Sequence, residues 1–171
     1  MKKIYIIVLS LILILSFVLL PNWGYGKPNL EKHAREEMCV DDHWDGVMAI
    51  HDSIAAFLFY DETGWNYTYV LFINWPTPYS LGYFFSSGGC TGDELLGVVK
   101  YENNLSGEVV YLSMNQQSVD FVTIETNGVI STLNIDPTKP FAISANRNEN
   151  YTFYSQDGQE ISCMDSGLSF R

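Results

Sequence analysis

The stretch IAAFLFYDETGWNYTYVLFI, residues 54–73, decides the fold class of this chain. Two apolar runs rich in aromatic and β-branched residues, Ile54–Tyr60 and 66–73, flank the short polar connection DETGW. Runs of this length and composition around a short turn that contains a glycine are typical of a β-hairpin. We therefore predict two antiparallel strands in this stretch.

The same alternation of short runs and turns continues along the rest of the chain. Segments 119–125 and 129–135 flank TNG, where Asn127 and Gly128 form the strongest tight-turn signal in the sequence. Further strands are predicted at 81–85, 96–102, 108–114, 141–145, 151–155 and 160–163. About nine strands with no βαβ spacing between them predict an all-β fold, an antiparallel β-sandwich or a partly open barrel.

The N-terminal segment has the pattern of an export signal or a membrane anchor. Two lysines precede an apolar run over residues 4–20, and Pro21 follows it. The length of this run lies between that of a signal-peptide core and that of a full membrane span. Residues 1–26 are predicted to be a single transmembrane anchor, or a signal peptide that is cleaved after Gly26. We favour the anchor.

The rest of the chain is predicted to lie outside the membrane. Residues 27–46 are expected to form a short stalk helix and an acidic turn, and residues 47–171 the exported β-domain. The predicted location is the cell membrane, with a single pass at residues 4–20 and the domain outside. Cleavage after Gly26 would make the protein secreted instead.

Composition excludes two classes of protein. Hydrophobic residues make up 47% of the chain and charged residues only 17%, which is the opposite of a disordered composition. Nine basic residues stand against twenty acidic ones, giving a net charge of −11. Because affinity for nucleic acid comes mainly from neutralising phosphates, a chain this acidic is not expected to bind DNA or RNA.

The order of these features resembles small exported proteins of Gram-positive bacteria. The resemblance is carried by a charged helix, an apolar hairpin, DFVTIETNGVISTLNI at 120–135, and PFAI followed by YTFYSQDGQEI. It covers about residues 45–162, and its motifs consist of turn residues and alternation. It implies an N-terminal anchor with one β-domain, and it implies no catalytic activity.

Aromatic residues crowd around the second strand of the first hairpin. By alternation, Tyr67, Tyr69 and Trp75 share one strand face, and Trp65 and Tyr79 lie close by in sequence. An exposed aromatic face is suited to stacking on cell-wall glycan or to contact with an envelope protein. Aromatic residues also fill the cores of β-sandwiches, so core packing is the alternative interpretation.

Segment 39–52 contains a second group of candidate residues. Its spacing partly imitates a calcium-binding loop, and its Cys-x3-His pattern offers two zinc ligands one helical turn apart. Binding of calcium or zinc is therefore the alternative to the first predicted function, which is binding of a cell-envelope component or partner protein through the aromatic face. The candidate metal ligands are Cys39, Asp41, His43, Asp45, His51 and Asp52.

The three cysteines leave several pairings open. Cys90 lies in a glycine-rich loop and Cys163 in the last predicted strand, so these two are disulfide candidates. Pairing of Cys39 with Cys90, or no disulfide at all, are the alternatives. The sequence contains no Ser-His-Asp order, paired catalytic carboxylates, phosphate-binding loop or dinucleotide-binding loop. We therefore predict a non-catalytic protein with no cofactor.

Overall fold

The computed structural model describes residues 2–19, 23–75, 81–90 and 93–169. Two α-helices, α1 (Lys2–Leu19) and α2 (Leu30–Met38), and two short 3-10 helices, η2 (Lys27–Asn29) and η3 (Asp93–Leu96), accompany the strands. The twelve strands in the described residues are β1 (Asp45–Ile50), β2 (Ile54–Tyr60), β3 (Tyr67–Asn74), β4 (Tyr83–Gly89), β5 (Val98–Asn103), β6 (Glu108–Ser113), β7 (Val119–Thr126), β8 (Val129–Asn134), β9 (Phe141–Ala145), β10 (Glu149–Ser155), β11 (Glu160–Ile161) and β12 (Cys163–Ser169). The all-β prediction is confirmed.

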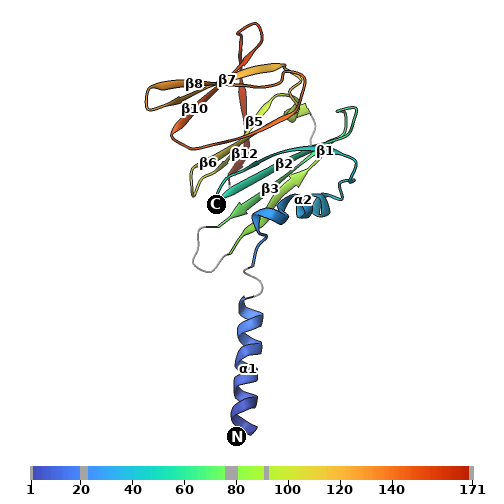
Figure 1. Ribbon diagram of the computed structural model, residues 1–171, viewed down its shortest axis with the longest axis vertical. Helices are drawn as coiled ribbons and strands as arrows, with labels where there is room; N and C mark the ends of the chain where they lie inside the picture. Colours follow the sequence, from blue (N-terminus) through green and yellow to red (C-terminus); the bar gives the residue numbers. More distant parts are fainter. Residues whose placement is uncertain (1, 20–22, 76–80, 91–92, 170–171) are drawn as a thin grey trace.

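The strands form three four-stranded sheets instead of the two sheets of the predicted nine-strand sandwich. The first sheet has the order β1-β2-β3-β4, the second β12-β5-β6-β9, and the third β11-β10-β7-β8 (Figure 1). Neighbouring strands are antiparallel, except that β12 pairs with β5 in parallel. The sequence interpretation missed β1 and most of β12, which follow acidic or polar residues and lack a clear alternation.

The main core lies between the first and second sheets. Ile54, Leu58 and Leu71 from the first sheet meet Val99 and Leu112 from the second, and all five are fully buried or nearly so. The hairpin register pairs Ile54 with Ile73 and Tyr60 with Tyr67, so alternate residues of β2 and β3 point into this layer.

The opposite face of the first sheet is covered by α2. Leu30 and Ala34 of the helix are fully buried against Phe57, Phe59 and Phe72. The segment predicted to be a stalk is therefore part of the domain, because the thin apolar stripe of the helix covers aromatic side chains that would otherwise face water. Strands β2 and β3 are consequently buried on both faces.

The third sheet packs on the outer face of the second sheet. Val98, Val109 and Tyr111 of the second sheet contact Val122 and Phe153 of the third. The domain is thus built of four layers, a helix followed by three sheets. The hairpin between β7 and β8 has the predicted turn, since Asn127 and Gly128 both have positive φ, 53° and 78°, as the favoured two-residue hairpin turn requires.

Residues 23–25 extend the first sheet beyond β4. The amide of Gly24 donates to the carbonyl of Leu81 at 2.7 Å, and Tyr25 and Tyr83 exchange two backbone hydrogen bonds of 2.7 and 2.9 Å. The ring of Tyr25 stacks on His33 of α2, with ring centroids 3.8 Å apart. A Cβ atom at Gly24 would lie 2.5 Å from the carbonyl oxygen of Tyr83, so only glycine allows this close approach.

Helix α1 stands apart from the sheets in Figure 1. It comprises 18 residues, Lys2–Leu19, and residue 20 of the predicted apolar run lies outside the described residues. None of the helices in the described part of the chain combines the length and hydropathy that a membrane span requires.

Phe57→Ala is expected to destabilise the domain by about 3–5 kcal/mol, because it empties a fully buried site between α2 and the first sheet. Trp65→Ala, which removes a larger but 80% exposed side chain, is the matched control and is expected to change stability by less than about 0.5 kcal/mol. Urea denaturation followed by circular dichroism measures both. Equal losses of unfolding free energy in the two variants would contradict the packing of α2 over Phe57 on the first sheet.

Candidate functional site

The predicted aromatic face is mostly inside the protein. Tyr67 and Tyr69 are only 9% and 8% exposed, and Tyr69 stacks on Tyr101 of the second sheet with centroids 5.4 Å apart. Trp75 packs against the same core, and Trp65 lies exposed in the β2–β3 turn. Alternation places Tyr67 and Tyr69 on one face as expected, and the second sheet covers that face, so these two residues belong to the core, as the core-packing interpretation has it.

Tyr79, the fifth residue of that predicted face, lies outside the described residues.

The three cysteines are free thiols and exposed, so the structure contains none of the disulfides considered for Cys39, Cys90 and Cys163. Although Cys163 is exposed as a residue, the protein atoms around its sulfur desolvate the thiolate and raise the pKa of the thiol to about 11, which keeps it protonated and a weak nucleophile at neutral pH.

The six predicted metal ligands do not form one site. Cys39, Asp41 and His43 lie between α2 and β1, where Nδ1 of His43 is 2.7 Å from Oδ1 of Asp41. His51 and Asp52 follow the opposite end of β1, a strand of about 17 Å at 3.3 Å per residue. The segment whose spacing partly imitates a calcium-binding loop, residues 41–52, contains this strand over half of its length, which keeps the two groups of ligands apart.

The His51 end of β1 carries a polar cluster that brings the first two sheets together. Nδ1 of His51 is 2.5 Å from Oε1 of Glu108, the first residue of β6. Ser53 donates to the other oxygen, Oε2, through its amide at 2.6 Å and its hydroxyl at 2.5 Å. Asn103, which is fully buried, donates to the carbonyl and hydroxyl oxygens of Ser53 at 3.3 and 3.1 Å.

Lys27 of η2 and Tyr83 of β4 complete this cluster. Oδ1 of Asp52 forms an ion pair with Nζ of Lys27 at 2.9 Å, and this contact lowers the pKa of Asp52. The hydroxyl of Tyr83 donates to the backbone carbonyl of His51. Ligand atoms of His51, Asp52 and Glu108 all lie within 4.8 Å of one another. The sequence pattern indicates His51 and Asp52 but not Glu108, because only the contact between two sheets brings Glu108 close to them.

The cluster does not have the geometry of a serine hydrolase triad. In such a triad the serine hydroxyl bonds to the imidazole, which is then oriented by the carboxylate. Here the hydroxyl of Ser53 donates to Glu108 instead, so the imidazole of His51 does not accept its proton. The arrangement is suited to holding the turns together and to presenting His51 and Glu108 to a cation.

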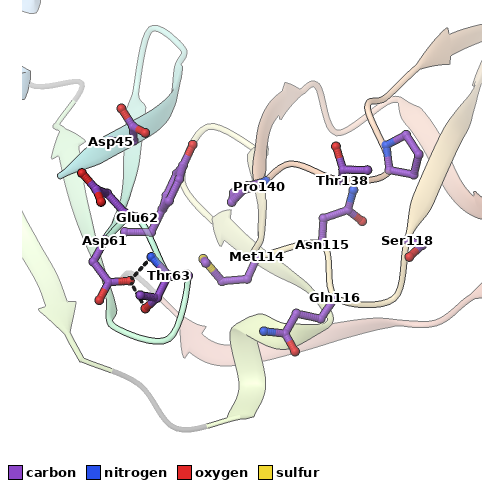
Figure 2. A pocket seen from close by; sticks show the side chains of 13 residues that line it. Asp45, Asp61, Glu62, Thr63, Met114, Asn115, Gln116, Ser118, Thr138 and Pro140 are labelled. Carbon is purple, nitrogen blue, oxygen red and sulfur yellow. Dashed lines mark hydrogen bonds between the residues drawn. The ribbon is translucent and has the colours of Figure 1, made fainter.

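The opposite end of the first sheet contains an open cleft of about 470 Å³. Residues from the start of β1, the β2–β3 turn, the β6–β7 connection and the β8–β9 connection line it, and Figure 2 shows them facing one another. Its lining is rich in oxygen atoms and acidic, and includes Asp45, Asp61, Glu62, Asn115 and Thr138. The carboxylates of Asp45 and Glu62 accept no hydrogen bond and form no ion pair within the described residues.

Other polar groups in the cleft are fixed by the fold. Nδ2 of Asn115 donates to the backbone carbonyls of Val119 and Asp136 at 3.2 and 3.0 Å, and Oδ1 of Asn115 accepts from the backbone amide of Val119 at 2.7 Å. Burial, with a smaller effect of Asp45, raises the pKa of Tyr60. The Tyr60 hydroxyl therefore stays protonated at neutral pH and can donate a hydrogen bond.

Asp61 shapes the turn beside the cleft. The side-chain amide of Asn66 donates to Oδ2 of Asp61 at 2.5 Å. The hydroxyl and backbone amide of Thr63 donate to Oδ1 of Asp61 at 2.7 and 3.1 Å, as the dashed lines in Figure 2 show. These hydrogen bonds, that of Asn66 foremost, lower the pKa of Asp61 to about 2.

Comparison with known proteins does not assign the chain to a group: no family model, no curated protein and no solved structure matches it. The resemblance to exported proteins of Gram-positive bacteria therefore stays a prediction. The candidate sites rest on their own geometry.

Asp61 is expected to contribute stability that depends on pH. Its folded pKa of about 2 lies below the ordinary 3.8, so its stabilisation is complete above about pH 4 and is lost as the pH falls toward 2. Asp61→Asn should lower stability at pH 7 and flatten the loss between pH 4 and 2. Asp157→Asn, at a turn carboxylate that accepts no hydrogen bond among the described residues, should leave that acid profile unchanged. Melting temperatures measured across this range check both.

Proposed function

We propose that this protein is an exported, membrane-tethered and non-catalytic β-domain that binds a component of the cell envelope through the cleft of Figure 2. One observation supports this proposal above the others, namely the meeting of turns from all three sheets around a space of about 470 Å³. Sites for small ligands usually have volumes of roughly 300–1,000 Å³. The cleft replaces the aromatic strand face as the proposed binding surface, because most of that face is buried.

The lining of the cleft favours a neutral or cationic ligand rich in hydroxyl or amine groups. Asp45 and Glu62 offer unengaged carboxylate acceptors, and the Tyr60 hydroxyl offers a donor. The net charge of −11 repels anionic polymers of the envelope. A hydroxyl-rich glycan of the cell wall satisfies both requirements, since its hydroxyl groups donate to carboxylates and carry no negative charge.

The contacts of Tyr25 with the domain support an uncleaved tether over a secreted form. Cleavage after Gly26 would remove the backbone pairing of Tyr25 with Tyr83 and the stacking of Tyr25 on His33. It would also expose part of the apolar layer beneath α2, which Tyr25 helps to cover. A mature chain that began at residue 27 would therefore lack a piece of its own first sheet. An uncleaved segment 4–20 keeps the domain at the outer surface of the membrane.

A chain truncated to residues 27–171 is expected to unfold at a lower temperature than one truncated to residues 23–171. The difference isolates residues 23–26, because neither chain contains α1. Thermal melts of the two truncated chains measure it, and N-terminal sequencing of the protein from host membranes tests retention directly. Equal melting temperatures together with a native N-terminus at residue 27 would contradict the uncleaved tether.

The double substitution Asp45→Asn/Glu62→Gln is expected to reduce retention on purified cell wall by about tenfold or more, because each hydrogen bond to a charged acceptor contributes about 1.5–3 kcal/mol. Sedimentation of the protein with insoluble cell wall measures this retention. The control is Glu125→Gln/Glu160→Gln, which removes the same charge from the third sheet, outside the cleft.

Equal loss of retention in both double variants would indicate a general charge effect and would contradict specific binding in the cleft. Unchanged retention in the cleft variant would contradict the proposal in the same way. A chain that does not sediment with cell wall but is captured by one envelope protein would replace the glycan with a protein partner.

A further inference from the structure

We propose that His51, Asp52 and Glu108 bind a divalent transition-metal ion of the zinc class, at a site separate from the cleft. The three side chains come from the β1–β2 turn and the start of β6, and their ligand atoms lie within 4.8 Å of one another. The site does not depend on the proposed envelope binding, because the cleft lies at the other end of β1 and β2.

Two ligand atoms from different sheets already converge at this site. Nδ1 of His51 lies 2.5 Å from Oε1 of Glu108, and the backbone amide of Asp52 lies 2.9 Å from the same nitrogen. An imidazole nitrogen has a single lone pair, so a metal ion bound to Nδ1 takes the place both of a proton between His51 and Glu108 and of the hydrogen bond from Asp52. The ligand atoms are thus assembled before the ion binds.

The carboxylate of Glu108 is also held in place by its surroundings. Ser53 donates two hydrogen bonds to Oε2, and the buried Asn103 in turn holds Ser53. This leaves Oε1 directed at His51. Hydrogen bonds of this kind to the distal oxygen of a ligand are what orients carboxylates at metal sites. The side chain of Glu108 is only 14% exposed, so few water molecules compete for it.

Asp52 supplies the third ligand from the solvent side. Its side chain is 86% exposed and its only ion pair in the described residues is with Lys27. An exposed carboxylate can turn from the ammonium group to a metal ion at little conformational cost. Lys27 therefore competes with the metal for Asp52.

The donor set favours zinc over calcium. One imidazole nitrogen and two carboxylate oxygens give three protein ligands, the number found at open zinc sites, which leave the fourth position to water. Calcium prefers six to eight oxygen ligands, and this cluster offers too few. Zinc bonds of about 2.1 Å in tetrahedral geometry would hold Nδ1 and Oε1 roughly 3.4 Å apart, so the His51 side chain must move outward by about 1 Å. Its place on a surface turn permits this movement.

Isothermal titration of the full chain in detergent with zinc chloride tests the proposal. The three thiols are first alkylated, because exposed cysteines also bind zinc. We expect one zinc ion per chain. His51→Gln and Asp52→Asn should each weaken zinc binding by at least about tenfold. Loss of a group that only hydrogen-bonds to a metal ligand already costs about tenfold in affinity, and loss of the ligand itself should cost no less. Asp52→Asn alters an exposed side chain, so it separates ligand loss from unfolding.

Two further variants make the test specific. Lys27→Gln should tighten zinc binding, because it releases Asp52 from its ion pair. His43→Gln is the matched control, since His43 also contacts a carboxylate, that of Asp41, but belongs to no group of three ligands in the described residues. Absence of zinc binding by the native chain, native affinity in the His51 and Asp52 variants, or an equal loss in the His43 variant would each overturn the proposal.

Discussion

Burial of β2 and β3 on both faces is the constraint on which the rest of this structure depends. The residues of the two strands alternate between the core shared with the second sheet and the layer under α2. A sheet that is apolar on both sides must be covered on both sides. This accounts for the packing of the short, highly charged helix α2 on the domain, and for the pairing of residues 23–25 with the edge of β4. Without these covers, Phe57, Phe59 and Phe72 would face water.

The layered architecture also determines where polar chemistry can gather. Because the central strands carry apolar residues on both faces, polar side chains collect where strands end and the turns of different sheets meet. The first such place joins the β1–β2 turn to the start of β6, where His51 meets Glu108. The second is the cleft, where the β2–β3 turn faces the connections that follow β6 and β8. Both sites are therefore products of stacking sheets, at opposite ends of the same strands.

The carboxylates of the molecule differ in how far their neighbours satisfy them. Twenty acidic residues stand against nine basic ones, so the acidic groups outnumber the basic partners available to them. Several carboxylates are satisfied by short local hydrogen bonds, as Asp61 is by Thr63 and Asn66 and Asp136 is by Thr138. Asp45 and Glu62 in the cleft have no such partner within the described residues, and Asp52 beside His51 is paired with Lys27. These are the carboxylates that remain able to bind something else.

Local sequence determined the hairpins of this protein. The turn at Asn127–Gly128, the β2–β3 pair and the division of the β3 residues between two faces all follow from turn chemistry and from the two-residue period of a strand. These features depend on residues that are neighbours along the chain. Sequence alone also determined the all-β class, because no helical periodicity separates the strands.

Only the tertiary structure decided what covers each face and which residues meet. Alternation assigns Tyr67 and Tyr69 to one face, yet it carries no information on whether water or a second sheet lies opposite. Likewise, nothing near His51 in the sequence indicates Glu108, which lies more than fifty residues further on. The order in which sheets stack is set by the summed burial of many side chains distant in sequence. That sum decided that the aromatic face is core and that the polar turns form the candidate sites.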